Sequence, residues 1–138
     1  MDIHLLIAMP DPKSQDLMLS LLNAASHLLP FKVEAHQARS RDELILQVRE
    51  KTDDVVFLDW QLAEANTPDL ARELDRLNPW LRVIVLLPLK LRQYRQCLWE
   101  TGICSCMPKE NLDHEWLCST LCLIHQAMLR ESRLASRT

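Results

Sequence analysis

One carboxylate and one amine stand where buried strands of this sequence are expected to end. Asp59 closes the apolar run Val55 to Leu58, and Lys109 follows the short apolar run at residues 103–107. Two charged groups of opposite sign at such an edge can act as a working chemical pair. They can also bind each other and satisfy backbone donors, because polar groups in a crevice need partners. We expect Asp59 and Lys109 to meet, and the spacing leaves both interpretations open.

The five cysteines suggest metal or redox chemistry. Cys104 and Cys106 are two apart, Cys118 and Cys122 are one helical turn apart, and Cys97 stands alone. However, neither a Cys-x-x-Cys pair nor the Cys/His spacing of a zinc site is present, and thiols are common small core residues. The odd, clustered set indicates reduced thiols in a reducing compartment. We expect structural thiols, and a thiol redox sensor is the weaker alternative.

The elements that position these groups alternate along the chain. Apolar runs predict strands, and 3.6-residue periodicity with capping residues predicts helices. Ser40 and Glu43 form a capping-box pattern, Thr67 and Pro68 predict an N-cap and first helical residue, and the only glycine, Gly102, predicts a helix end. The predicted strands are 3–8, 31–38, 54–59, 82–87 and 103–107, and the predicted helices are 12–29, 40–51, 68–78, 91–101 and 113–129. The first helix is expected to bury a stripe of Leu17, Leu21, Ala24 and Leu28.

Five strands alternating with five helices predict an α/β fold, a five-stranded parallel sheet with helices on both faces. The chain of 138 residues has room for one domain, which we place at residues 1–130. Residues 131–138 lose the apolar stripe and are expected to be a C-terminal tail or the start of a linker to a further output domain.

Charge and hydropathy exclude some function classes. A net charge of −3 gives no long-range attraction to phosphate backbones or anionic lipid, so we expect no nucleic-acid binding by this domain alone. No apolar segment reaches the roughly 18 residues of a membrane span, and the N-terminus lacks the pattern of a secretory signal. We therefore expect a cytoplasmic protein.

With these elements in order, the sequence resembles the receiver domain of bacterial two-component response regulators along essentially its whole length. The likeness is carried by "VVFLDW" with Asp59, "RVIVLLP", "TGICSCMPKE" with Lys109, and "HLLIAMPDP" at the first strand. The resemblance implies the flavodoxin-like receiver fold, with Asp59 at the phospho-acceptor position and Lys109 beside it. It also implies a step of 22 residues between the fourth-strand hydroxyl residue and the lysine, which here separates Leu87 from Lys109.

Other positions depart from the family's pattern. The acidic pair that helps to hold Mg²⁺ in the family is replaced by Met9 and Pro10, which offer no side-chain oxygen ligand. Only Asp11, one residue further on, can substitute, and its alternative role is to face the dipole at a helix N-terminus. Leu87 stands where the family has Ser or Thr, and Cys106 stands where it has a switch aromatic residue.

These departures favour an atypical receiver, or pseudo-receiver. We expect a non-enzymatic signalling module that binds proteins, with weak or no phosphorylation of Asp59 and no firm cofactor. The alternative is a phosphorylatable receiver in which Asp59 accepts phosphate and Asp11 helps Asp59 to hold Mg²⁺. The resemblance implies a histidine kinase or another signalling protein as partner, with transcription regulation among the outputs.

A basic segment with aromatic residues marks a candidate interaction surface. Arg92 and Arg95 lie close to Trp99 in the predicted fourth helix. Arg and Trp are enriched in interface hot spots, although such a charged run is also typical of a solvated helix face. In the family, helix four, strand five and helix five form the usual output and dimerisation face. A homodimer through this face is therefore an expectation.

Overall fold

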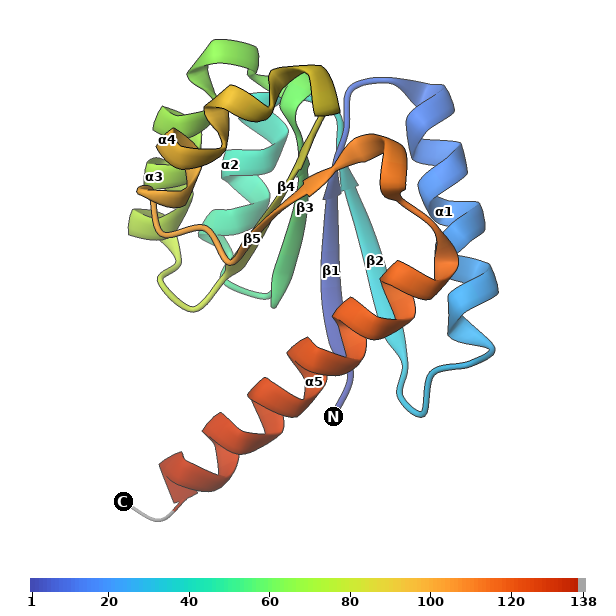
Figure 1. Ribbon diagram of the computed structural model, residues 1–138. Coiled ribbons are helices and arrows are strands. Elements are labelled where there is room, and N and C mark those ends of the chain that lie inside the picture. Colours follow the sequence, from blue (N-terminus) through green and yellow to red (C-terminus); the bar gives the residue numbers. More distant parts are fainter. Residues whose placement is uncertain (137–138) are drawn as a thin grey trace.

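A single parallel sheet forms the centre of the computed structural model, which describes residues 1–136 (Figure 1). The strands are β1 (Ile3–Ala8), β2 (Val33–Ala38), β3 (Val55–Asp59), β4 (Arg82–Leu87) and β5 (Ser105–Pro108). Their order in the sheet is β2-β1-β3-β4-β5, and every neighbouring pair is parallel. This is the flavodoxin-like order, in which the chain reverses direction across the sheet beside β1. The predicted fold class is confirmed.

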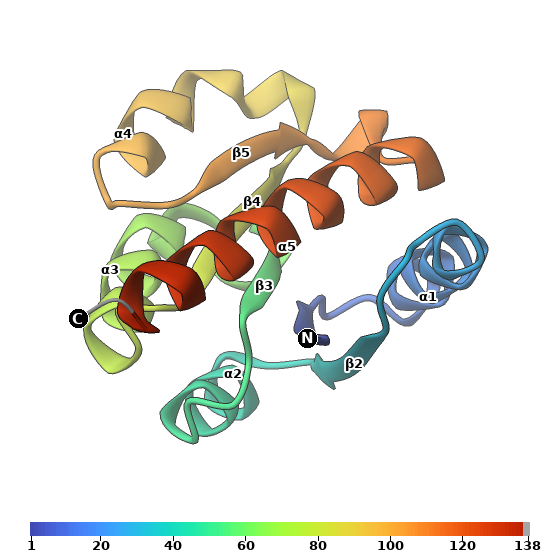
Figure 2. The same ribbon diagram turned by 90° about the horizontal axis from the view of Figure 1, so that it is seen from below.

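Helices cover both faces of the sheet, as right-handed crossovers require (Figure 2). The α-helices are α1 (Pro12–Ser26), α2 (Arg41–Arg49), α3 (Thr67–Leu77), α4 (Arg95–Trp99) and α5 (His114–Ser136). Short 3₁₀ turns are η1 (Trp60–Leu62), η2 (Glu64–Asn66), η3 (Leu89–Tyr94) and η4 (Lys109–Asn111). Helices α1 and α5 cover one face, and α2, α3 and α4 cover the other.

The two faces bury separate apolar layers because alternate strand residues point to opposite sides. Leu5 and Phe57 pack on the side of α1 and α5, whereas Leu6 and Leu58 pack on the side of α2 and α3. All five residues of β3 are buried, as expected for a central strand of a parallel sheet. The ends of β3 are therefore held rigidly, and its last residue is Asp59.

The buried face of α1 differs from the predicted stripe. Leu17 and Leu28 are 57% and 67% exposed, and the helix buries Met18, Leu22 and Ala25 instead, together with Gln15. The buried glutamine explains the error, because its amide donates to the Met9 carbonyl at 2.6 Å and so enters the core as a satisfied polar group. Pattern reasoning that counts only apolar residues misses a face that begins with Gln15.

The helix starts were predicted with mixed success. Ser40 caps α2 by accepting a hydrogen bond from the Glu43 amide, as predicted, although the Glu43 carboxylate returns to Arg39 rather than to Ser40. The predicted N-cap at Thr67 is wrong. Asn66 precedes α3, Thr67 is its first residue, and the Thr67 hydroxyl is buried without a partner.

The segment predicted as one helix at 91–101 is two shorter pieces. Residues Leu89–Tyr94 form η3 and only Arg95–Trp99 are α-helical, because the backbone at Leu91 leaves the helical region. Gly102 lies three residues past α4 with φ of 87°, so it ends a turn and does not cap the helix directly. The fifth strand begins two residues later than predicted, at Ser105.

Helix α5 is longer than the sequence pattern indicates. It runs to Ser136, so residues 131–136 of the expected tail are helical, and residues 137–138 lie outside the described part of the chain. Glu131 accepts a hydrogen bond from Arg82 at the start of β4, which supports this extension. Among residues 1–136, no helix combines the length and apolar character needed to cross a membrane. Lys51 and Glu64 adopt positive φ, at 57° and 49°.

Candidate functional site

The Asp59 carboxylate lies at the carboxyl end of the sheet, where ligand sites of doubly wound folds are found. The residue is only 1% exposed. One carboxylate oxygen, Oδ2, accepts a hydrogen bond from Lys109 Nζ at 2.7 Å, and Oδ1 accepts one from the Gln61 backbone amide at 2.9 Å. The predicted contact between Asp59 and Lys109 is therefore present. The buried charge has both a counter-ion and a backbone donor.

Two neighbouring connections are tied together next to this pair. Lys109 opens η4 directly after β5, and its side chain is 28% exposed. Both carboxylate oxygens of the next residue, Glu110, lie 3.1 Å from the Leu89 amide that follows β4. Sequence reasoning missed Glu110, because nothing in its spacing shows that residues 89 and 110 come together. The contact fixes the loop in which Lys109 sits.

Asp11 is the N-cap of α1. Its carboxylate accepts hydrogen bonds from the Ser14 hydroxyl at 3.0 Å and from the Lys13 amide at 3.3 Å. The Ser14 hydrogen bond is the main cause that holds the pKa of Asp11 below its usual value, and the Lys109 charge adds a smaller effect in the same direction. The capping role expected for Asp11 is confirmed, and it lies within electrostatic reach of Lys109.

The two positions before Asp11 do not supply metal ligands through their side chains. The Met9 side chain is 1% exposed and packs in the apolar layer beneath α1 and α5. Its carbonyl is occupied by Gln15, which in turn accepts a hydrogen bond from Arg39 at 3.2 Å. Mg²⁺ requires a near-octahedral set of oxygens. Here the Asp59 carboxylate is hydrogen-bonded to Lys109 and that of Asp11 to the start of α1, and Met9 and Pro10 add no side-chain oxygen to them.

The end of β4 is apolar where it faces the same edge. Leu87 is 2% exposed and is the strand's last residue, one beyond the residue that pairs with Asp59. On β5, Cys106 pairs with Val85 and packs against the apolar layer of α2, α3 and α4. Burial raises the pKa of the Cys106 thiol, and the nearby Arg95 charge opposes this shift. No hydroxyl or aromatic ring occupies these two positions.

All five cysteines are free thiols. Burial raises the pKa of Cys118 as well as that of Cys106, and a raised pKa lowers the fraction of reactive thiolate. The structural interpretation is therefore favoured at Cys106 and Cys118, whereas Cys97 and Cys104 are exposed and are not core thiols.

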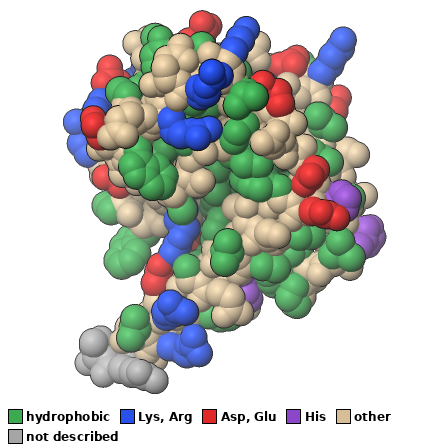
Figure 3. Space-filling view, in the orientation of Figure 1, with side chains coloured by type: hydrophobic (Ala, Val, Ile, Leu, Met, Phe, Trp, Pro, Cys, Tyr) green, Lys and Arg blue, Asp and Glu red, His purple; other side chains and the backbone are tan. Residues whose placement is uncertain are grey.

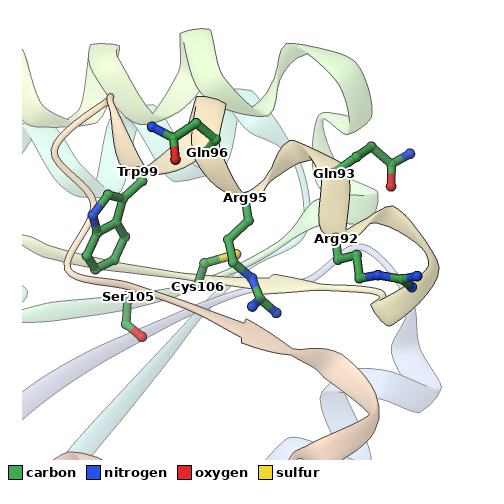
Figure 4. Close-up of a pocket in the computed structure, with 7 residues that line it drawn as sticks. All are labelled: Arg92, Gln93, Arg95, Gln96, Trp99, Ser105 and Cys106. Atoms are coloured by element: carbon green, nitrogen blue, oxygen red, sulfur yellow. The ribbon is translucent and has the colours of Figure 1, made fainter.

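The predicted interaction residues line one open pocket. Arg92, Arg95 and Trp99 face a cavity of about 550 Å³ between η3, α4 and β5 (Figure 4). Its remaining lining residues are Gln93, Gln96, Ser105 and Cys106. Trp99 is 57% exposed, and basic side chains gather over η3 and α4 in the space-filling view (Figure 3). Helix α5 contributes no residue to this pocket.

An aromatic contact links the two regions. Trp60, the residue after Asp59, is buried, and its ring lies 4.7 Å from the ring of Tyr94 at the end of η3. Sequence reasoning noted neither ring as part of a contact, because residues 60 and 94 come together only when β3 and β4 pair side by side. The carboxyl end of the sheet, where Asp59 lies, is thus in packing contact with the segment that carries Arg92 and Arg95.

Comparison with known proteins gives a fold. No protein-family model and no curated protein sequence matches the chain. Among solved structures, a two-component response regulator from Clostridium difficile superposes with a TM-score of 0.76 at 16% identity, covering 91% of this chain and 98% of that one.

Two other structures show the range of proteins with this fold. The receiver domain of a sensor histidine kinase from Pseudomonas aeruginosa PAO1, solved with a magnesium ion in its active-site cleft, gives a TM-score of 0.69 at 14% identity, with 88% and 95% of the two chains covered. A putative pilus assembly protein from Burkholderia thailandensis gives 0.70 at 16% identity, with 90% and 98% covered. The chain therefore has the fold of the response-regulator receiver domain.

Proposed function

We propose that the chain is a pseudo-receiver, a non-enzymatic signalling module that binds other proteins and in which Asp59 is phosphorylated weakly or not at all. One observation carries the proposal. The buried Asp59 carboxylate is bonded to Lys109 and to a backbone amide, while Met9, Pro10 and Leu87 offer no side-chain oxygen beside it. The charge that a phosphoryl group would bring has Lys109 as its main stabilising partner.

The missing contacts set the size of the expected defect. Phosphoryl transfer depends on positioning and on neutralising the charge of the transferred group. A hydrogen bond to a charged group contributes about 1.5–3 kcal/mol. Losing the Leu87-position hydroxyl and one metal carboxylate would then slow transfer by about 10²- to 10⁴-fold.

The test is intact-mass spectrometry after treatment with acetyl phosphate in Mg²⁺. We expect the unmodified mass for the natural chain and for Asp59→Asn alike. The matched gain-of-function variant combines Pro10→Asp with Leu87→Thr and restores one carboxylate and one hydroxyl. Its adduct should exceed that of the natural chain and should disappear when Asp59→Asn is added. A stoichiometric adduct on the natural chain that vanishes in Asp59→Asn would overturn the proposal.

The second candidate is the phosphorylatable receiver, in which Asp11 and Asp59 hold Mg²⁺ between them. Lys109 is hydrogen-bonded to Asp59 and its charge also reaches Asp11, so both carboxylates lie around the same amine, which favours this candidate. Calorimetric titration with Mg²⁺ separates the two candidates. Saturable binding that Asp11→Asn abolishes would support the phospho-acceptor function, and heats no larger than dilution would support the pseudo-receiver.

The partner surface of the proposed module is the pocket formed by η3, α4 and β5. Its open shape, exposed Trp99 and two arginines suit an acidic segment of a histidine kinase or of another cytoplasmic signalling protein, or a second copy of this chain. For the dimer through α4, β5 and α5, light scattering at micromolar protein should report twice the chain mass. Arg95→Glu should shift this mass toward the monomer, whereas Arg72→Glu on α3 should not. A concentration-independent monomer would exclude the dimer.

A further inference from the structure

Three potential metal ligands meet at the opposite end of the sheet from Asp59, where β1 and β2 begin. His4 on β1 pairs with Glu34 on the edge strand β2, and His36 lies two residues further along β2, on the same face. The His4 Nδ1 and Glu34 Oε2 atoms are 3.1 Å apart. One ligand atom from each of the three side chains lies within 4.8 Å of the others. The strand register alone creates this juxtaposition.

A buried carboxylate lies beside this group. Asp53 precedes β3, is only 5% exposed, and neither of its oxygens makes a hydrogen bond of standard geometry. Burial raises its pKa. The Gln47 side-chain donor, which reaches the carboxylate without standard hydrogen-bond geometry, and the imidazoles of His36 and His4 act in the opposite direction. Buried carboxylates without partners are rare because they are costly. The cost falls if positive charge is placed on the two imidazoles.

We propose that His4, Glu34 and His36 bind a divalent transition-metal ion, with Zn²⁺ as its representative, and that the buried charge of Asp53 supports the site electrostatically. Two imidazoles and one carboxylate are a ligand set that zinc uses with a fourth position left for water or another group. Imidazole suits Zn²⁺ and its neighbours, whereas Mg²⁺ prefers oxygens alone. This site therefore differs in position and in ligand chemistry from the end of the sheet that holds Asp59 and Lys109.

The geometry needs only small side-chain movements. Zinc bonds of about 2.0–2.2 Å place tetrahedral ligand atoms about 3.4 Å from each other. The residues lie on the edge strand β2 and its neighbour β1 (Figure 2), and Glu34 and His36 are exposed, so rotation about their side-chain bonds can close the remaining gap. A bound ion would link the edge strand β2 to β1 through side chains of both strands.

The experiment is calorimetric titration of the chain, purified without a polyhistidine tag, with Zn²⁺. We expect one site, with affinity lowered at least about 10- to 100-fold in His36→Ala and in Glu34→Gln, since even outer partners of metal ligands contribute this much. The matched control His27→Ala removes an exposed histidine outside the cluster and should leave the affinity unchanged. Mg²⁺ should give no binding at this site.

A thermal scan and a spectrum complete the test. Because an ion that binds only the folded state raises Tm, Zn²⁺ should raise the Tm of the natural chain and of His27→Ala but not that of His36→Ala. The Co²⁺ complex should show ligand-field bands without thiolate charge transfer, which excludes the cysteines as ligands. Equal Zn²⁺ affinity in the natural chain and both ligand variants, a thiolate band, or a Kd above about 1 mM would each overturn the proposal.

Asp53 is tested separately, because its role is to position and compensate rather than to ligate. Asp53→Asn should weaken Zn²⁺ binding by about 10- to 100-fold. In chelator, the same variant should be at least as stable as the natural chain, since it removes an unpartnered charge. A variant that loses stability in chelator but keeps full Zn²⁺ affinity would overturn this part of the proposal.

Discussion

Strand β3 has a buried aspartate near each end, and the two carboxylates differ in their hydrogen-bond partners. Asp59, its last residue, is 1% exposed and bonded to Lys109 and to the Gln61 amide. Asp53, two residues before the strand, is 5% exposed, and neither of its oxygens makes a hydrogen bond of standard geometry, although the Gln47 side chain acts to lower its pKa. Similar burial of two carboxylates therefore does not mean a similar contribution to the free energy of unfolding. The partner of each carboxylate decides whether it stabilises or destabilises the fold, and partners at strand ends come from other loops.

The largest effect should come from removing the partner of Asp59. Lys109→Met leaves a buried carboxylate without its counter-ion, which costs about 3–5 kcal/mol in buried pairs, and the 28% exposure of Lys109 places the expected loss near the lower end. Urea unfolding measures it. In a double-mutant cycle, Asp59→Asn should recover part of the loss, because neutralising both groups removes the unpaired charge. Strict additivity would show that the two side chains are not coupled.

An intermediate effect of opposite sign is expected at the other end of β3. In chelator at neutral pH, Asp53→Asn should raise the free energy of unfolding by about 1–2 kcal/mol, because an unsatisfied buried charge costs more than a neutral amide. The pKa of Asp53 in the folded chain is raised by burial, so the native state holds its proton to higher pH than the unfolded chain. The penalty is fully present above the folded pKa and disappears below the unfolded value of 3.8.

The pH dependence gives this prediction its control. The stability difference between Asp53→Asn and the natural chain should shrink as pH falls through the raised pKa toward 3.8. Thermal unfolding from pH 4 to 8 records it. A difference that does not change with pH would mean that the charge of Asp53 is compensated in the folded chain.

The smallest effect should come from an exposed ion pair. Arg72 and Asp69 on α3 lie 3.2 Å apart, but their side chains are 48% and 77% exposed. Exposed pairs of this kind contribute about 0.3–0.5 kcal/mol. Arg72→Ala should therefore change the urea midpoint little, and less still in high salt. A loss comparable with that of Lys109→Met would contradict the idea that burial sets the value of each pair.

Much of the fold could be predicted because it depends on local patterns. The apolar runs of β1, β3 and β4 and the cap at Ser40 are encoded in short stretches, and the structure confirms them. The errors occur where tertiary contacts override the pattern. Gln15 is buried because it meets the Met9 carbonyl, and α5 continues to Ser136 with an Arg82 contact that no local pattern reports.

The candidate sites divide in the same way between what local patterns predict and what tertiary contacts determine. The Asp59–Lys109 contact was predictable, because the carboxyl ends of parallel strands share one edge of a sheet. The cluster of His4, Glu34 and His36 was not, because it depends on the register between β1 and β2, which the exposed, weakly patterned edge strand does not specify. The sequence around Asp53 also does not indicate that its carboxylate is buried without hydrogen bonds of standard geometry.

The shortage of glycine has a consequence for engineering this chain. Lys51 and Glu64 hold left-handed backbone conformations that glycine adopts without steric cost. Lys51 lies two residues before Asp53, and Glu64 lies five residues after Asp59. Strained non-glycine residues tend to occur next to functional sites, where neighbouring structure holds them in place. The two positions are thus a reserve of thermostability. Glycine at either position would relieve the steric cost of the left-handed conformation, and the larger entropy that glycine loses on folding would offset part of this gain.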